Sequence, residues 1–216
     1  PHDIRDTNGQ GLEFIGVKAN NAILYETLPG STWPVDSIWT SSGVYGAAFM
    51  DINSDGHDEV AVIKNVEVGS STQRAVVINR RVGDYFVVEH TLLNTTPTTV
   101  KNEFVNKLAS GDFDNDGNFD ILTADTDGDV MVYEWSPALQ SFEMSWYTHL
   151  PVKNCYYLAA GNFRGTGATD FCVGGYTTNT SDPAKAYSFF GIFCPTGQDN
   201  DYAFCDYFSF GDVQSA

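Results

Sequence analysis

The chain has 216 residues, of which 28 are Asp or Glu and 11 are Lys or Arg, and its formal net charge is −17. Nucleic acids and anionic membrane surfaces are held by clustered basic side chains, and the only adjacent basic pair is Arg80-Arg81. With 42% hydrophobic and 14% aromatic residues the chain can bury a substantial core, and no apolar run approaches the roughly 18 residues of a membrane helix. The composition therefore argues against nucleic-acid partners and membrane insertion.

Short runs rich in Val, Ile, Tyr and Phe, bounded by Gly, Asn and Asp, predict β-strands along most of the chain. No segment sustains a helical periodicity. In chain order the predicted strands lie near 13–18, 22–27, 35–40, 44–50, 59–64, 74–80, 85–92, 104–111, 120–124, 129–135 and 142–148. The Asp127-Gly128 pair predicts a hairpin turn between two of them.

An acidic loop recurs between predicted strands, and its copies begin at Asp51, Asp112 and Asn162. Four antiparallel strands per unit, at a repeat of roughly 50 residues, are typical of β-propeller blades. The repeat predicts complete blades over 41–98, 99–150 and 151–200. A further blade is predicted to combine 1–40 with 203–212.

The two ends of the chain carry complementary parts of one repeat. Residues 205–212 line up with 155–162, the first strand of a unit. Residues 6–13 resemble the acidic loop, but this copy lacks one residue and carries Gln10. We therefore predict an all-β, single-domain β-propeller over 1–216, with four blades closed by pairing of the N- and C-terminal strands. The alternatives are a segment of a larger propeller, an assembling half-ring, or a different β-fold.

The acidic loops have the side chains and the spacing of a calcium site. Oxygen-bearing side chains occupy positions 1, 3, 5 and 9, and Gly at position 6 permits a sharp turn. An EF-hand is rejected because position 12 is Val62 or Thr123 and both flanks are strands; plain Asp/Asn/Gly turns are the remaining alternative. The predicted ligands are Asp51, Asn53, Asp55, His57 (through its carbonyl) and Glu59 in one loop, and Asp112, Asp114, Asp116, Asn118 (through its carbonyl) and Asp120 in the other.

These two loops resemble the FG-GAP/VCBS-type calcium-loop β-propeller repeats of integrin α-chain ectodomains, some fungal lectins and many secreted microbial proteins. The resemblance covers most of the chain in blade organisation, although only 51–59 and 112–120 match the motif closely. It implies calcium held between the first two strands of a blade. The third loop departs from the motif because Arg164 and Thr166 replace acidic ligands, and we expect Arg164 to pair with Asp170. The prediction is two structural Ca²⁺ ions.

Four cysteines and two glycosylation sequons indicate an extracellular protein. The cysteines lack a Cys-x-x-Cys spacing, and their even number favours disulfides. The pairs Cys172–Cys194, symmetric about the Asp182-Pro183 turn, and Cys155–Cys205, in equivalent strands, are predicted, while the other two connectivities stay open. Asn94 and Asn179 are the candidate glycosylation sites. Together with the acidity, these features predict secretion.

The sequence contains no constellation typical of an enzyme. His2, His57, His90 and His149 are scattered, and no nucleophile or nucleotide-binding motif is present. Trp33 and Trp39 are candidates for stacking on a sugar, and the remaining aromatic residues are expected in the core. We predict a non-catalytic binding or adhesion module whose ligand is a glycan or an extracellular protein. The alternatives are a self-assembling subunit of an extracellular filament or coat, and a polysaccharide-active lyase or hydrolase.

Overall fold

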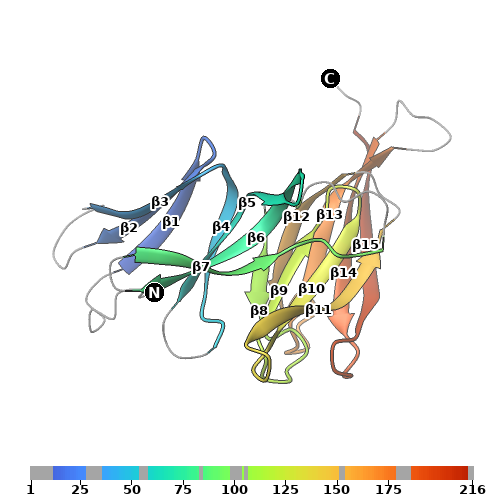
Figure 1. Ribbon diagram of the computed structural model, residues 1–216. Helices are drawn as coiled ribbons and strands as arrows, with labels where there is room; N and C mark the ends of the chain where they lie inside the picture. Colours follow the sequence, from blue (N-terminus) through green and yellow to red (C-terminus); the bar gives the residue numbers. More distant parts are fainter. Residues whose placement is uncertain are drawn as a thin grey trace. The chain divides into compact units, whose positions relative to one another are not determined.

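The computed structural model describes residues 12–27, 36–53, 58–82, 85–97, 104, 107–150, 154–178 and 186–213. This part of the chain is all β, and none of it forms a helix that could cross a membrane. The strands are β1 Leu12–Lys18, β2 Asn21–Thr27, β3 Asp36–Ser42, β4 Val44–Met50, β5 Glu59–Val68, β6 Ser71–Val82, β7 Tyr85–Leu92, β8 Ala109–Gly111, β9 Asp120–Ala124, β10 Asp129–Ser136, β11 Ser141–His149, β12 Asn154–Gly161, β13 Asp170–Thr178, β14 Ala186–Pro195 and β15 Tyr202–Val213 (Figure 1).

The chain divides into two compact units, Pro1–Leu93 and Asn94–Ala216. Unit 1 holds the sheets β1-β2-β3 and β4-β5-β6-β7, and unit 2 holds the sheets β8-β9-β10-β11 and β12-β13-β14-β15. All strand pairs in these sheets are antiparallel and join neighbours in the sequence. The predicted all-β fold is confirmed: the described residues form three four-stranded antiparallel sheets and one three-stranded antiparallel sheet.

The last strand belongs to a different sheet from the one predicted. Residues 203–212 were expected to complete the blade of β1–β3, but β15 pairs with β14, as in the register pair Phe190↔Phe208. The reason is the short 196–201 turn, in which the Thr196 amide donates to the Asp201 carbonyl at 3.0 Å. Closing this short hairpin loses less chain entropy than pairing β15 with a strand far away in the sequence. Among the described residues, the first sheet has three strands.

The core of unit 2 lies between its two sheets and is largely aromatic. Phe113, Leu122, Phe171 and Phe193 are buried there, and the Trp146 ring meets the Phe171 and Phe193 rings edge-on at 5.8 and 5.6 Å. All five residues of β9 are buried, including the polar Asp120 and Thr123, so this inner strand is covered on both faces. The prediction that the aromatic residues other than Trp33 and Trp39 lie in the core is confirmed for this cluster, but it is wrong for Phe204, Tyr207 and Phe208 on β15, which are exposed.

The disulfide observed is Cys194–Cys205, and Cys155 and Cys172 are free thiols. Both predicted bridges are therefore wrong. The β14–β15 pairing explains this, because it brings the Cα atoms of Cys194 and Cys205 to 6.0 Å, within disulfide range. Cys172 instead lies in register with Ile192. Cys155 is fully buried, and burial together with the nearby Asp125 and Asp127 raises the pKa of its thiol to about 12.

Thiol mapping checks this connectivity. Alkylation of the unfolded, unreduced chain is expected to modify two cysteines, and a digest should contain one cross-linked peptide pair joining Cys194 to Cys205. In the folded chain Cys155 should react far more slowly than Cys172, because thiolate attack requires access and deprotonation. A cross-linked peptide containing Cys155 or Cys172 would contradict the observed pairing.

Candidate cation site

The 112–120 loop joins β8 to β9 and folds its carboxylates inward. Gly117 has a φ of +94°, as the position-6 glycine of the predicted turn requires. One oxygen of Asp112 accepts the amides of Asn115 (2.7 Å) and Asp116 (3.2 Å), and its other oxygen accepts the amide of Gly117 (3.0 Å). These bonds hold the loop in a tight arc around Asp112.

Three carboxylates converge at this arc. Asp112, Asp114 and Asp116 each offer an oxygen, and the three oxygens lie within 4.8 Å of one another. Asp116 accepts the backbone amide and the side-chain amide of Asn118. Three negative charges at this separation repel one another unless a cation or protons compensate them, so the loop has the charge and the oxygen donors that Ca²⁺ takes.

Asp120, at position 9 of the loop, is fully buried, and only one of its two carboxylate oxygens has a hydrogen-bond partner among the described residues. Its Oδ2 accepts the Phe113 amide at 2.8 Å, whereas its Oδ1 is buried and has no hydrogen-bond partner among the described residues. Burial raises the pKa of Asp120 to about 8, and the charges of Asp114, Glu134 and Asp112 act in the same direction. A buried carboxylate oxygen without a donor is costly, and a bound cation would remove that cost.

The third loop shows how the same position is satisfied when the acidic ligands are missing. Asp170 is fully buried like Asp120, and its Oδ1 accepts Arg164 Nη2 at 2.8 Å and Arg164 Nε at 3.0 Å. The backbone amide of Arg164 donates to Oδ2 at 3.1 Å. The expected Arg164–Asp170 pair is confirmed, and the guanidinium supplies the positive charge in this loop.

The 51–59 loop repeats one feature of the 112–120 loop. Glu59 is buried, and its Oε2 accepts the Ile52 amide at 3.1 Å, as Asp120 accepts the amide of Phe113. Asp51 and Asn53 lie in the described part of the loop, while Asp55 and His57 lie outside the described residues. This loop therefore shares its position-9 anchor with the 112–120 loop.

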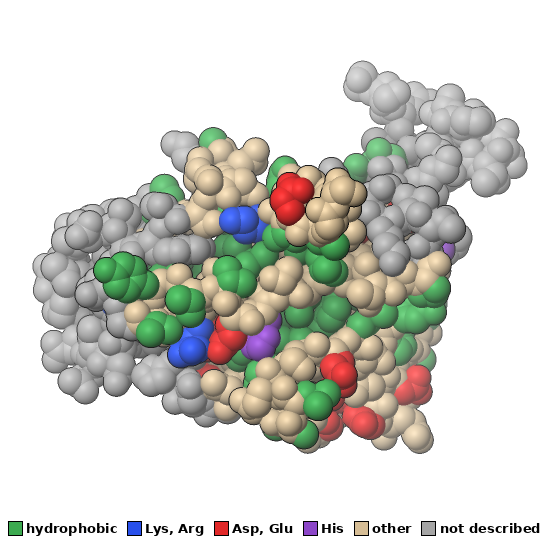
Figure 2. Space-filling model, viewed as in Figure 1, with side chains coloured by type: hydrophobic (Ala, Val, Ile, Leu, Met, Phe, Trp, Pro, Cys, Tyr) green, Lys and Arg blue, Asp and Glu red, His purple; other side chains and the backbone are tan. Residues whose placement is uncertain are grey.

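Two acidic residues beside the 112–120 loop were missed by the sequence reasoning. Glu134 on β10 lies in register with Asp120, and Asp199 lies in the turn between β14 and β15. Acidic side chains gather at the lower end of unit 2 in Figure 2, where Figure 1 places this turn and the β8–β9 loop. Glu134 could have been suspected because it interrupts the run of apolar and aromatic side chains at 130–135, but Asp199 carries no comparable signal.

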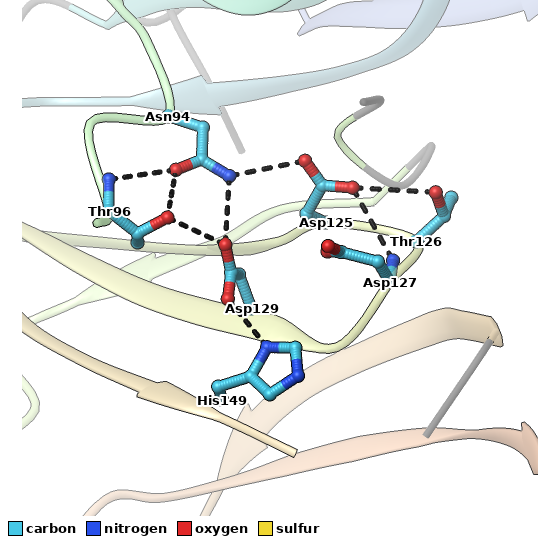
Figure 3. Close-up of polar contacts among 7 residues, drawn as sticks. All are labelled: Asn94, Thr96, Asp125, Thr126, Asp127, Asp129 and His149. Atoms are coloured by element: carbon cyan, nitrogen blue, oxygen red, sulfur yellow. Dashed lines mark hydrogen bonds and ion pairs between the residues drawn. The ribbon is translucent and has the colours of Figure 1, made fainter. Parts of the chain in front are cut away.

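A second polar network surrounds the β9–β10 hairpin (Figure 3). The predicted Asp127-Gly128 turn is present, with Gly128 at a φ of +116°. The buried Asp129 accepts the Thr96 hydroxyl at 2.6 Å and contacts His149 Nδ1 at 2.8 Å. The Asn94 side-chain nitrogen donates to both Asp125 and Asp129, each at 3.2 Å. Asp125 and Asp129 are thus satisfied by donors from the chain, although Oδ1 of Asp127 in the same turn is buried without a hydrogen-bond partner among the described residues.

This network argues against a glycan on Asn94. The Asn94 side chain is 6% exposed, and the nitrogen that would carry the sugar makes two hydrogen bonds. A glycan would replace one of them and need space that a buried side chain lacks. Asn179, Trp33 and the Trp39 side chain lie outside what the structure describes.

An aromatic row crosses one face of the β12–β15 sheet. Tyr157, Gly174, Phe190 and Phe208 lie in register on the four consecutive strands. The three aromatic side chains are 60%, 37% and 47% exposed. A Cβ on Gly174 would stand 2.6 Å from the Phe190 ring, so the ring lies over the bare glycine backbone.

The chain matches no protein-family model, and no curated protein matches its sequence. The resemblance to FG-GAP/VCBS-type repeats therefore rests on the loop motif and the repeated strand order.

Proposed function

We propose that this chain is a calcium-stabilised, non-catalytic binding module that works outside the cell. The observation that carries the calcium assignment is the contrast between Asp120 and Asp170. Both are fully buried at the same loop position, yet Asp170 meets a guanidinium while Asp120 Oδ1 has no donor in the described chain and lies near Asp112 and Asp114. A divalent cation in the 112–120 loop would play the part that Arg164 plays in the third loop.

The residues present fit such an ion by their chemistry. Ca²⁺ prefers six to eight oxygen ligands, with carboxylates carrying the charge. Asp112, Asp114, Asp116 and Asp120 would hold the ion, with the Asn118 carbonyl as a further oxygen. Because all of these ligands come from one loop, the ion would brace the β8–β9 connection and has a structural role.

The binding surface of this proposal is the aromatic row of Tyr157, Phe190 and Phe208. Flat, exposed rings bind the apolar faces of sugars, and polar neighbours orient the hydroxyl groups. Ser188 and Asp206 lie two residues from Phe190 and Phe208 along their strands, and so on the same face. The chain's strong negative charge favours a neutral glycan over an acidic one, since like charges repel at close range.

Glycan binding tests the proposed function. The wild-type chain, screened against neutral glycans in millimolar calcium, is expected to bind at least one class, and Y157A and F208A should weaken that binding about tenfold or more, as loss of one stacked ring does. Tyr85 on β7 is 77% exposed, so Y85A removes an exposed ring elsewhere and should bind like the wild type.

Three outcomes would count against the glycan assignment. The first is that the wild-type chain binds no neutral glycan, and the second is that Y85A weakens glycan binding as much as Y157A and F208A do. The third is that the wild-type chain forms concentration-dependent oligomers and that Y157A and F208A are monomeric. The last outcome would assign the aromatic row to self-assembly.

A further inference from the structure

A second acidic cluster shares Asp114 with the first. Oxygens of Asp114, Glu134 and Asp199 lie within 4.8 Å of one another. These residues come from three places in unit 2: the β8–β9 loop, strand β10, and the turn between β14 and β15. The cluster therefore joins the turn of one sheet to the body of the other.

Asn200 ties the turn to this cluster with two short hydrogen bonds. Its backbone amide donates to Asp114 Oδ2 at 2.6 Å, and its side-chain nitrogen donates to Glu134 Oε2 at 2.6 Å. Asn200 adopts a left-handed conformation with a φ of +53°, which turns its amide toward the carboxylates. The turn is thus held in place with Asp199 directed at two further acids.

Unsatisfied buried oxygens surround the same point. Asp114 Oδ1 and Asn200 Oδ1 are buried and have no hydrogen-bond partner in the described part of the chain. The same holds for Asp120 Oδ1 and for the hydroxyl of Tyr202, whose side chains are 0% and 5% exposed. Tyr202 begins β15 directly after the turn that holds Asp199 and Asn200, and burial together with the charges of Asp120, Asp114 and Glu134 raises the pKa of its hydroxyl. Unpartnered acceptors around three converging carboxylates indicate a missing positive charge.

We infer that Asp114, Glu134 and Asp199 hold a second divalent cation, which shares Asp114 with the ion of the 112–120 loop and fastens the β14–β15 turn to the β8–β11 sheet. The inference rests on the proposed calcium site of that loop, because Asp114 serves both ions. The carboxylate oxygens of the three acids fit Ca²⁺. The ion would therefore link two sheets, whereas the loop ion braces only one connection.

Calcium stoichiometry tests this inference. Equilibrium dialysis of the full chain is expected to give one Ca²⁺ fewer per chain for D199N and for E134Q than for the wild type. Asp199 is exposed in a turn, so D199N should keep the fold, and near-ultraviolet circular dichroism checks this. Glu143, an exposed acid opposite Glu134 on β11, provides the matched control: E143Q should leave the stoichiometry unchanged.

Terbium luminescence locates the loss. Tb³⁺ replaces Ca²⁺ at oxygen sites, and the nearby Tyr202 ring should sensitise its emission. We expect D199N to lower the tyrosine-sensitised emission at saturating Tb³⁺. We expect D112N to remove the ion of the 112–120 loop and to leave the emission from the ion held by Asp199. An unchanged stoichiometry in D199N and E134Q, or a weaker affinity at constant stoichiometry, would overturn the second cation and leave the loop ion standing. A wild-type chain that binds no calcium would overturn both.

Discussion

Excess EGTA is expected to lower the midpoint of thermal unfolding by about 5–10 °C relative to millimolar calcium. A ligand present at a hundred times its dissociation constant stabilises the folded state by about 2.7 kcal/mol, and 1 kcal/mol corresponds to about 2–4 °C in a chain of this length. The physical source is the relief of repulsion among Asp112, Asp114 and Asp116 and the pairing of the buried Asp120. Differential scanning calorimetry measures the shift, and magnesium added with EGTA controls for ionic strength.

The calcium effect should grow with pH. Without calcium, the folded-state pKa of Asp120 is about 8 against an ordinary value of 3.8, so this group's contribution to stability is full below about pH 4 and is lost as the pH rises toward about 8. Calcium binds the ionised carboxylates and gains affinity over the same range. The midpoint difference between calcium and EGTA should therefore be larger at about pH 8 than at about pH 5. A midpoint insensitive to EGTA at both values would leave the loops as plain turns.

Replacing Arg164 should have two opposite consequences that depend on what replaces it. R164A leaves Asp170 fully buried without its guanidinium, and an unsatisfied buried carboxylate should lower the midpoint by roughly 3–10 °C. Calcium should not restore the loss, because Asn162 and Thr166 offer too little charge to hold an ion. The triple variant N162D/R164D/T166D recreates the ligand spacing of the 112–120 loop and should bind one additional Ca²⁺.

The comparison of these two variants separates a cation requirement from a packing requirement. In EGTA both variants should be less stable than the wild type. In millimolar calcium the triple variant should recover most of its midpoint, and R164A should not. R164K, which keeps the charge but loses the fork of two hydrogen bonds to Asp170 Oδ1, should fall between the wild type and R164A. Equal behaviour of R164A and the triple variant in calcium would refute the equivalence of the two loops.

Local sequence patterns predicted the parts of this protein that local chemistry determines. The strands follow from β-branched and aromatic runs, and the turn of the 112–120 loop follows from the Asp-x-Asp-x-Asp-Gly spacing, with Gly117 at positive φ. The Arg164–Asp170 pair was predictable for the same reason. Both residues belong to one loop, and a buried carboxylate is stabilised by an ion pair with a nearby basic side chain.

The features that were missed depend on which strands pair and on how the two sheets of unit 2 pack. The likeness of 205–212 to 155–162 suggested an inner strand, but a Cys followed by alternating aromatic residues suits an outer strand equally well. Once β15 pairs with β14, Cys194 and Cys205 become neighbours, and both predicted disulfides are lost together. Glu134 reaches the 112–120 loop through its register with Asp120 on β9, whereas Asp199 reaches it only through the packing of the two sheets of unit 2, which no spacing along the chain encodes.

The strictly sequential pairing of the strands bears on how this chain folds. In the described sheets each strand hydrogen-bonds only to strands adjacent in the sequence, so every hairpin can close over a short stretch of chain at low entropic cost. Contact order is low for such meanders compared with β-sandwiches that pair distant strands, and low contact order is associated with fast folding. The slow events are then confined to the stacking of completed sheets and to oxidation of Cys194 and Cys205, which lie 11 residues apart on a single hairpin.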